Sequence, residues 1–186
     1  MRPMLLDFFD DETCHYLDRQ YMFGDSLLVA PIFNDQGRVR YYVPKGEWTN
    51  ILTQEKVAGG NWHSEEHDYL TLPLLAKENS IIVFGNNDQT AEYDYRSKPS
   101  FHVFELKNTK SVIYDLSGKE TGEITGQKAG NMLVFNVEGI NGTFEIVLRN
   151  VPNVESVEGG SIEKSEFGVK ITSEEKTIRV KLENGG

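Results

Sequence analysis

The chain has 186 residues, 38% hydrophobic and 26% charged, so it can form one medium domain or two small ones around a real core. Its formal net charge of −10 indicates a surface that is acidic overall, and acidic surfaces repel nucleic-acid phosphates and anionic lipid. We therefore expect neither a nucleic-acid partner nor a membrane partner. The single cysteine, Cys14, excludes an internal disulfide and fits a reducing compartment, so we expect a cytoplasmic location.

The first predicted element is a short helix from about residue 11 to residue 23. Asp10 or Asp11 can cap its start, because an aspartate oxygen accepts from free amide groups of the first turn. Gly24 stands where a left-handed residue commonly ends a helix. Three residues recur at helical spacing and would form one face of this helix: Cys14, Leu17 and Tyr21.

Strands and turns follow from Leu27 onwards. The run LLVAPIF is continuously apolar, which is typical of a strand covered on both faces. Pro31 within it has no amide hydrogen and favours an edge or a bulge at that point. The segments RVRYYVP, GEWTNIL, DYLTLPLL and NSIIVFG predict further strands of a first β-unit.

The polar stretch GNNDQTAEYDYRSKPS breaks the hydrophobic pattern and predicts a boundary between two units. After it the alternation is cleaner, with Phe144, Ile146 and Leu148 expected to face inward and Arg149 outward. Asn141-Gly142 predicts a hairpin, and so does the turn TSEEK. The fold class that we predict is all-β, with two antiparallel β-sandwich-like units and one short N-terminal helix.

One candidate chemistry is esterase catalysis at Ser26. Gly24-Asp25-Ser26-Leu27 spells the signature of GDSL-type esterases, and Gly85-Asn86-Asn87-Asp88 fits their G-x-N-D block. A serine nucleophile needs a base, which that family supplies as Asp-x-x-His. None of the histidines has an aspartate three positions earlier; they are His15, His63, His67 and His102. Ser26 is therefore interpreted as a turn residue, with the esterase kept as a remote alternative.

A second candidate is a zinc site in HSEEH. His63, Glu66 and His67 fit H-x-x-E-H, which on a helix aligns two histidines on one metal. Gly59-Gly60 before the motif and a predicted strand after it disfavour a helix. We interpret the segment as a polar loop and assign no metal.

A third candidate is sugar binding by exposed aromatic side chains, which can stack on sugar rings. Sandwich cores also use aromatic residues, so packing is the competing interpretation. An independent carbohydrate-binding β-sandwich module remains the main alternative function. Its candidate residues are Trp48, Trp62, Tyr41, Tyr42, Tyr69, Tyr93 and Tyr95.

The strand pattern also carries a resemblance over about residues 1–106. Three blocks of the sequence resemble, in order, blocks of the C-terminal part of glycoside hydrolase family 31. The first is MRPM with the later DRQYMFGDSLLVAPIF, the second is YYVPKGEWTNILTQEKVAGG, and the third is YLTLPLLAKENSIIV. WHSEEHDYL and GNNDQTAEYDY resemble its bacterial α-xylosidase branch. Further on, LVFNVEGINGTFEIVLRNV is similar to the terminal domain of that branch.

The resemblance implies a place for each part of the chain. Residues 1–25 would be the end of a catalytic (β/α)₈ barrel with the short helix, and 26–87 the proximal C-terminal β-domain. Residues 88–97 would be a linker, and 98–186 the distal C-terminal β-sandwich. Because MRPM resembles the close of a barrel strand, we expect a fragment of a longer protein.

The family is retaining and works in carbohydrate metabolism with two barrel aspartates and without metal or cofactor. No residue here matches either aspartate motif, so we assign no catalytic, cofactor-binding or metal-binding residue. We expect the chain alone to be inactive and to support the barrel of its parent, an α-xyloside or α-glucoside hydrolase. Carbohydrate would bind only in the parent's active site, and the β-units could also form homo-oligomer contacts.

Overall fold

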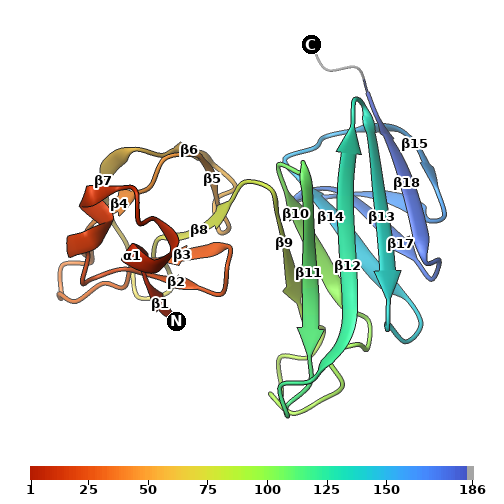
Figure 1. Ribbon diagram of the computed structural model, residues 1–186, viewed down its shortest axis with the longest axis horizontal. Coiled ribbons are helices and arrows are strands. Elements are labelled where there is room, and N and C mark those ends of the chain that lie inside the picture. Colours follow the sequence, from red (N-terminus) through yellow and green to blue (C-terminus); the bar gives the residue numbers. More distant parts are fainter. Residues whose placement is uncertain (184–186) are drawn as a thin grey trace. The chain divides into compact units, whose positions relative to one another are not determined.

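The structure is a computed structural model that describes residues 1–183. Its internal contacts divide the chain into two compact units, Met1–Glu78 and Asn79–Gly186. Figure 1 shows strands in both units and helical turns only near the N-terminus. The all-β prediction is therefore confirmed. Within the described range, no helix has the length and apolar character needed to cross a membrane.

The first unit contains a six-stranded antiparallel sheet and a separate strand pair. The sheet has the order β1-β2-β3-β8-β5-β6, and the pair is β4-β7. Its elements are β1 Arg2–Pro3, α1 Met4–Asp7, the 3-10 helix η1 Glu12–Tyr16, β2 Tyr21–Phe23, β3 Leu27–Val29, β4 Arg38–Val43, β5 Glu47–Asn50, β6 Lys56–Ala58, β7 Asn61–Glu66 and β8 Leu74–Lys77.

The core of the first unit gathers side chains from the helical turns, the sheet and the strand pair. Met4 of α1 and Cys14 of η1 are fully buried in the same cluster as Tyr41 and Trp48. Trp48 donates its Nε1 to the carbonyl oxygen of Pro44 at 2.9 Å, which satisfies its one polar atom. The N-terminal segment is thus an integral part of this unit.

The predicted helix over residues 11–23 is correct only in its first turns. Asp11 caps η1 by accepting from the amide of Thr13 at 3.1 Å. The helix ends at Tyr16, and residues 21–23 form strand β2 instead.

A buried side chain explains why the helix stops. Gln20 donates its Nε2 to the Tyr42 carbonyl at 2.7 Å and accepts from the Tyr42 amide at 2.8 Å. These two bonds hold the chain against β4, and such tertiary contacts override weak helical propensity. Gly24, with φ +65°, turns the chain between β2 and β3 rather than ending a helix.

The second unit contains two five-stranded sheets, in the orders β16-β17-β14-β10-β9 and β11-β12-β13-β18-β15. All its strand pairs are antiparallel except the parallel pair β10-β14. Its strands are β9 Ser80–Phe84, β10 Ser100–Phe104, β11 Asn108–Tyr114, β12 Glu120–Ala129, β13 Met132–Glu138, β14 Phe144–Arg149, β15 Val154–Glu158, β16 Ser161–Ser165, β17 Gly168–Ser173 and β18 Thr177–Leu182.

The boundary between the units lies earlier than the predicted linker 88–97. Strand β9, which we expected to close the first unit, pairs with β10 over its whole length. Ile81 of β9 is buried in the core of the second unit. The division therefore falls between Glu78 and Asn79, and the segment 88–97 lies inside the second unit.

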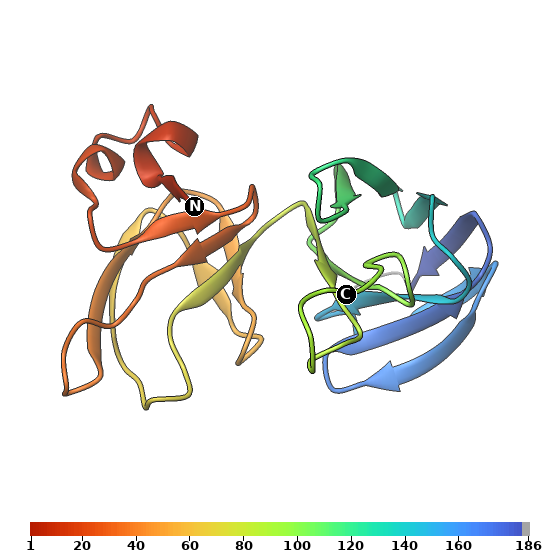
Figure 2. The ribbon, with the colours of Figure 1, turned by 90° about the horizontal axis from the view of Figure 1, so that it is seen from below.

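The inward faces of the second unit follow the predicted alternation. Phe144, Ile146 and Leu148 from one sheet share a buried cluster with Phe135 and Ile178 from the other. The two sheets form separate layers of a sandwich around this cluster, as Figure 2 shows. The alternation was sufficient to place side chains in this core because one face of each strand is buried.

Both predicted hairpins in this half are wrong, however. Strand β13 pairs with β12 and β18, whereas β14 pairs with β10 and β17, so the Asn141-Gly142 turn joins two different sheets. The TSEEK segment likewise joins β17 of one sheet to β18 of the other. A turn signal in the sequence shows where the chain reverses. It does not show which strands pair, because the strands of both layers of a sandwich carry the same apolar pattern.

Candidate functional site

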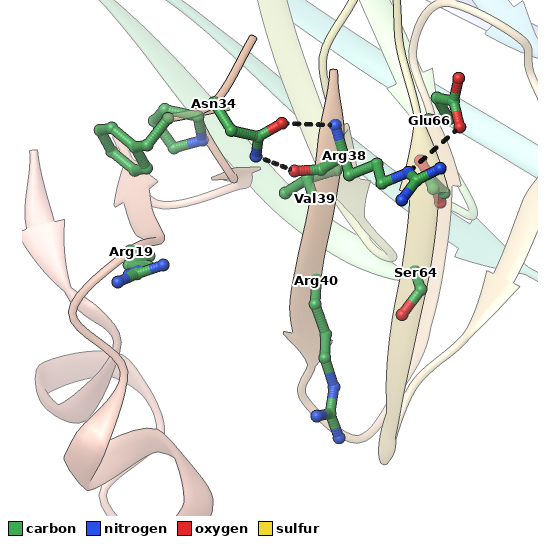
Figure 3. Close-up of a pocket in the computed structure, with 10 residues that line it drawn as sticks. Arg19, Asn34, Arg38, Val39, Arg40, Ser64 and Glu66 are labelled. Carbon is green, nitrogen blue, oxygen red and sulfur yellow. Dashed lines mark hydrogen bonds and ion pairs between the residues drawn. The ribbon is translucent and has the colours of Figure 1, made fainter. Parts of the chain in front are cut away.

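A cavity of about 570 Å³ lies in the first unit beside strands β4 and β7 (Figure 3). Three arginines line it: Arg38 and Arg40 from β4, and Arg19 from the segment between η1 and β2. Phe33 and Ser64 line it as well. The cavity thus combines positive charge with an aromatic ring and a hydroxyl group.

The register of β4 and β7 determines which side chains share the cavity face. Arg38 lies opposite Glu66 and Arg40 opposite Ser64, and directly opposed residues of antiparallel strands point to the same side. Arg38 Nε lies 3.5 Å from Glu66 Oε2. Asn34 also holds the backbone of Arg38, because the Asn34 Oδ1 accepts a hydrogen bond from the Arg38 amide at 3.0 Å.

Glu65 also lines the cavity, but its carboxylate bonds with residues of the opposite face. Its Oε1 accepts from the Tyr41 hydroxyl at 2.5 Å, and its Oε2 lies 2.8 Å from Nε2 of His67. Burial, and then this carboxylate, raises the pKa of Tyr41. Glu65 therefore contributes little countercharge to the arginines.

Arg40 and Arg19 have no carboxylate partner among residues 1–183. The Arg40 guanidinium carbon lies 4.8 Å from the ring centroid of Trp62, a cation–π contact. The net effect is a cationic cavity on a chain whose formal net charge is −10.

A second cavity of about 530 Å³ also lies in the first unit. Its lining mixes apolar residues, such as Val29, Ile32 and Leu72, with polar ones, such as Asn34 and Gln36. His67 reaches it but is held by Glu65 and by Thr71, whose Oγ1 lies 3.1 Å from Nδ1. This cavity therefore combines apolar surface with polar groups, and its lining includes two carboxylates, Asp35 and Asp68, but no arginine or lysine.

Ser26 lies in the turn between β2 and β3, where its carbonyl accepts from the Lys77 amide at 2.8 Å. The four histidines make their contacts elsewhere: His15 with the Phe9 carbonyl, His63 with the Tyr41 ring, His67 with Glu65, and His102 with Arg149. The surrounding elements are strands, so the strand–turn–helix geometry of a serine nucleophile is absent from this turn.

The HSEEH segment is a strand rather than a helix or a loop. Strand β7 spans Asn61–Glu66, so His63 and Glu66 point to opposite faces of the pair. His63 stacks on Tyr41, and its Nε2 is buried without a hydrogen-bond partner among the described residues. In the part of the chain that the structure describes, no group of three or more metal-ligating side chains comes together.

Most aromatic candidates for sugar binding are core residues. Trp48, Tyr41 and Tyr42 are 1%, 1% and 6% exposed. Trp62 is 47% exposed, but Arg40 and Tyr42 both contact its ring. Tyr69 is fully exposed at the rim of the second cavity, and Tyr93 packs edge-on against Tyr95.

The one cysteine is not a nucleophile. Cys14 is buried, and burial, followed by the nearby charge of Asp11, raises the pKa of its thiol to about 12. The thiol is therefore protonated at neutral pH, and thiols react as thiolates.

A buried cation in the second unit was missed from the sequence. Arg149, expected to face outward, does leave the core face but is only 4% exposed. Its Nε donates to Nδ1 of His102 at 2.9 Å, and its guanidinium lies 4.0 Å from the Phe167 ring centroid. Burial and then the Arg149 charge lower the pKa of His102 to about 4. The only sequence signal for this buried pair is the polar residues at alternate positions of FHVFEL and FEIVLRN. Such alternation does not show whether a polar side chain is buried.

Comparison with known proteins identifies the family of the chain. Residues 1–82 match the family model "Glycosyl hydrolase family 31 C-terminal domain", and residues 94–183 match the model "Alpha-xylosidase YicI, C-terminal domain". The chain therefore belongs to glycosyl hydrolase family 31, as part of its C-terminal region. The resemblance predicted from the sequence is confirmed.

Curated relatives agree with this assignment. The alpha-xylosidase XylQ of Lactiplantibacillus pentosus is 41% identical over 147 residues, which cover 76% of this chain and 19% of that protein. Alpha-glucosidase 2 of Bacillus thermoamyloliquefaciens is 31% identical over 141 residues, covering 74% of this chain and 17% of its own. The chain thus spans less than a fifth of the length of these relatives.

A solved structure has the same fold. The cycloalternan-forming enzyme from Listeria monocytogenes superimposes with a TM-score of 0.80 at 23% identity, over 97% of this chain and 20% of that one.

Proposed function

We propose that the chain is the non-catalytic C-terminal part of a retaining α-glycoside hydrolase that acts on α-xylosides or α-glucosides. The main observation that supports this proposal is the order of the two matching family models, which together span nearly all of the chain. Two of the curated relatives that match it are an alpha-xylosidase and an alpha-glucosidase, and each is roughly four times as long as this chain. On this proposal the paired carboxylates that a retaining mechanism needs come from the rest of the parent enzyme.

The proposed role of the two β-units is to cover and stabilise the catalytic barrel. An exposed apolar surface on the first unit supports this role. Leu6, Phe9 and Tyr16 of the α1–η1 segment are 67%, 72% and 85% exposed, although this segment is anchored in the core by Met4 and Cys14. Rigid apolar side chains left in water mark an interaction surface.

We assign this surface, defined by Leu6, Phe9 and Tyr16, to the barrel of the parent. The N-terminal blocks of the sequence resemble the family's passage out of that barrel, which is why the barrel is the proposed partner. Phe8 of the same segment is not part of the surface, because its ring packs 6.0 Å from that of Trp48 within the unit. Leu5, like Phe8, is half-buried in its own unit.

A chimera tests the proposal. The matching C-terminal region of the Lactiplantibacillus pentosus alpha-xylosidase would be replaced by this chain, and hydrolysis of an aryl α-xyloside would be measured. We expect the truncated relative to lose activity and the chimera to recover it. The triple variant L6S/F9S/Y16S should lower the recovered activity roughly tenfold or more, because the lost apolar contacts are worth a few kcal/mol together.

The matched control is a second triple variant, L116S/Y114S/I162S, at apolar residues of the second unit that are 66%, 49% and 47% exposed. It should leave the chimera active. Full activity of the truncated relative without any C-terminal region would reject the supporting role. Equal loss in both triple variants would reject the assigned surface.

We also propose that the parent works in the cytoplasm without cofactor, and that the β-units contribute contacts between copies where the parent is an oligomer. The single, buried Cys14 suits a reducing compartment. A periplasmic or secreted pool of the parent in a cell fractionation would contradict the location.

The alternative of an independent module for neutral sugars is supported by two exposed aromatic candidates, Trp62 at 47% and Tyr69 at 98%. Calorimetric titration with xylo- and gluco-oligosaccharides separates the two functions. Binding that disappears in Trp62→Ala would favour the module, whereas absence of binding supports the structural role.

A further inference from the structure

We propose that the cavity beside β4 and β7 binds a sugar that carries a carboxylate, that is, a uronic acid or a saccharide ending in one. The proposal rests on three properties of the cavity: cations without countercharge, walls that are already in place, and a lining that suits a sugar ring. It does not depend on the reaction of the parent enzyme.

The first property is charge. Of the three arginines that line the cavity, only Arg38 is balanced within it, by Glu66 at 3.5 Å. Arg19 and Arg40 have no carboxylate within the described chain, and Glu65 is engaged by Tyr41 and His67. Guanidinium groups bind carboxylates through paired hydrogen bonds, so an anionic ligand supplies the missing countercharge.

The second property is preorganisation. Asn34 fixes the backbone of Arg38 through its side-chain amide, and the Arg38 side chain reaches from β4 across to Glu66 of β7, as Figure 3 shows. Arg40 is held against the ring of Trp62 at 4.8 Å. Groups held in this way lose less conformational entropy when a ligand binds.

The third property is the remaining lining. Phe33 is 69% exposed and lines the cavity together with Pro31, which gives it an apolar side. Ser64 of β7, opposite Arg40, offers a hydroxyl group. A volume of about 570 Å³ lies within the usual range for small-molecule sites. A hexuronate ring presents the matching groups: one carboxylate, several hydroxyls and an apolar ring face.

The test is isothermal titration calorimetry of the 186-residue chain at low ionic strength. The probes are sodium D-glucuronate, D-glucose and sodium sulfate. We expect D-glucuronate to bind with an affinity roughly tenfold or more above that of D-glucose, since charge-assisted hydrogen bonds separate the two ligands. The affinity should fall as salt is added, because the site is open to solvent.

Variants locate the binding. Arg19→Gln and Arg40→Gln should each weaken D-glucuronate binding roughly tenfold, and Phe33→Ser should weaken it less. The matched control is Arg179→Gln, which removes an exposed arginine of β18 in the second unit and should change nothing. Far-UV circular dichroism checks that each variant is folded.

Four results would overturn the proposal. They are no detectable binding of D-glucuronate, D-glucose binding as tightly as D-glucuronate, sulfate binding as tightly as D-glucuronate, and equal loss of affinity in Arg19→Gln and Arg179→Gln. The third would mean unspecific attraction of anions, and the fourth an effect of net charge alone.

Discussion

The two units of the chain build cores of different chemistry. The cluster of the second unit consists of aliphatic side chains and phenylalanines, such as Phe135 and Ile146. The cluster of the first unit includes Cys14, Tyr42 and Trp48, whose polar atoms need partners. The second unit is therefore stabilised mainly by apolar area, whereas the first depends on particular hydrogen bonds inside or beside its core.

This difference matches the proposed roles. A sandwich that closes on its own apolar core can tolerate a variable surface. The helical segment of the first unit exposes Leu6, Phe9 and Tyr16, and hydrogen bonds fix that segment in place. The first unit therefore keeps a defined surface for a partner. The bond from the Tyr42 hydroxyl to Asp11 Oδ2, at 2.8 Å, is one such fixing contact.

The largest effect should come from the apolar core of the second unit. Phe135 is fully buried, so Phe135→Ala should lower the free energy of unfolding by roughly 3–5 kcal/mol. Amide hydrogen exchange along β12 and β13 would report the loss of protection. A loss below about 1 kcal/mol would contradict a core held together by apolar packing.

The next largest effect is a pH dependence of stability, caused by the buried His102 beside Arg149 in the second unit. His102 has its pKa lowered from 6.5 to about 4 in the folded protein. Below pH 6.5 the unfolded chain takes up this proton, and the folded chain does not until about pH 4, so stability should fall as the pH drops through that window. The full loss is roughly 3 kcal/mol, from 1.36 kcal/mol per pH unit.

Urea unfolding at pH 7, 5.5 and 4.5 measures this pH dependence. The variant His102→Gln should flatten the profile in that window, because glutamine does not titrate there. An identical slope in wild type and His102→Gln would show that the buried histidine does not titrate in this way.

A smaller effect is expected in the first unit from Gln20→Ala. The substitution leaves the buried amide and carbonyl of Tyr42 without their partners, which should cost roughly 1–3 kcal/mol. Both tryptophans, Trp48 and Trp62, lie in this unit, so their fluorescence reports its unfolding directly. An unchanged unfolding midpoint would mean that Gln20 does not fix the segment before β2.

The smallest effect should come from Ser26→Ala. Ser26 contributes its backbone carbonyl to the contact with Lys77, which alanine retains, so stability should change by less than about 0.5 kcal/mol. Hydrolysis of p-nitrophenyl acetate is the functional check. Activity that disappears in this variant would revive the esterase alternative.

Much of the fold could be predicted from the sequence because side-chain alternation reports burial directly. The inward positions of β14, Phe144 to Leu148, were predicted correctly for this reason. The strand partners were not, since both layers of a sandwich show the same alternation. The helix over residues 11–23 failed because the deciding bond joins Gln20 to Tyr42, far apart in the sequence.

The cavity was even less accessible to sequence reasoning. Arg19, Phe33, Arg40 and Ser64 come from four separate segments, and only the folded chain brings them together. The short matches around Ser26 and HSEEH were visible as letters but lacked the helices that their chemistry requires. Three ordered blocks of residues identified the family where single motifs misled.

The most direct test of the central claim is a glycosidase assay on the pure 186-residue chain with p-nitrophenyl α-xyloside and p-nitrophenyl α-glucoside. A chain whose catalytic carboxylates belong to the rest of the parent enzyme should release no p-nitrophenol above the enzyme-free rate. Turnover that co-purifies with the chain would contradict the account.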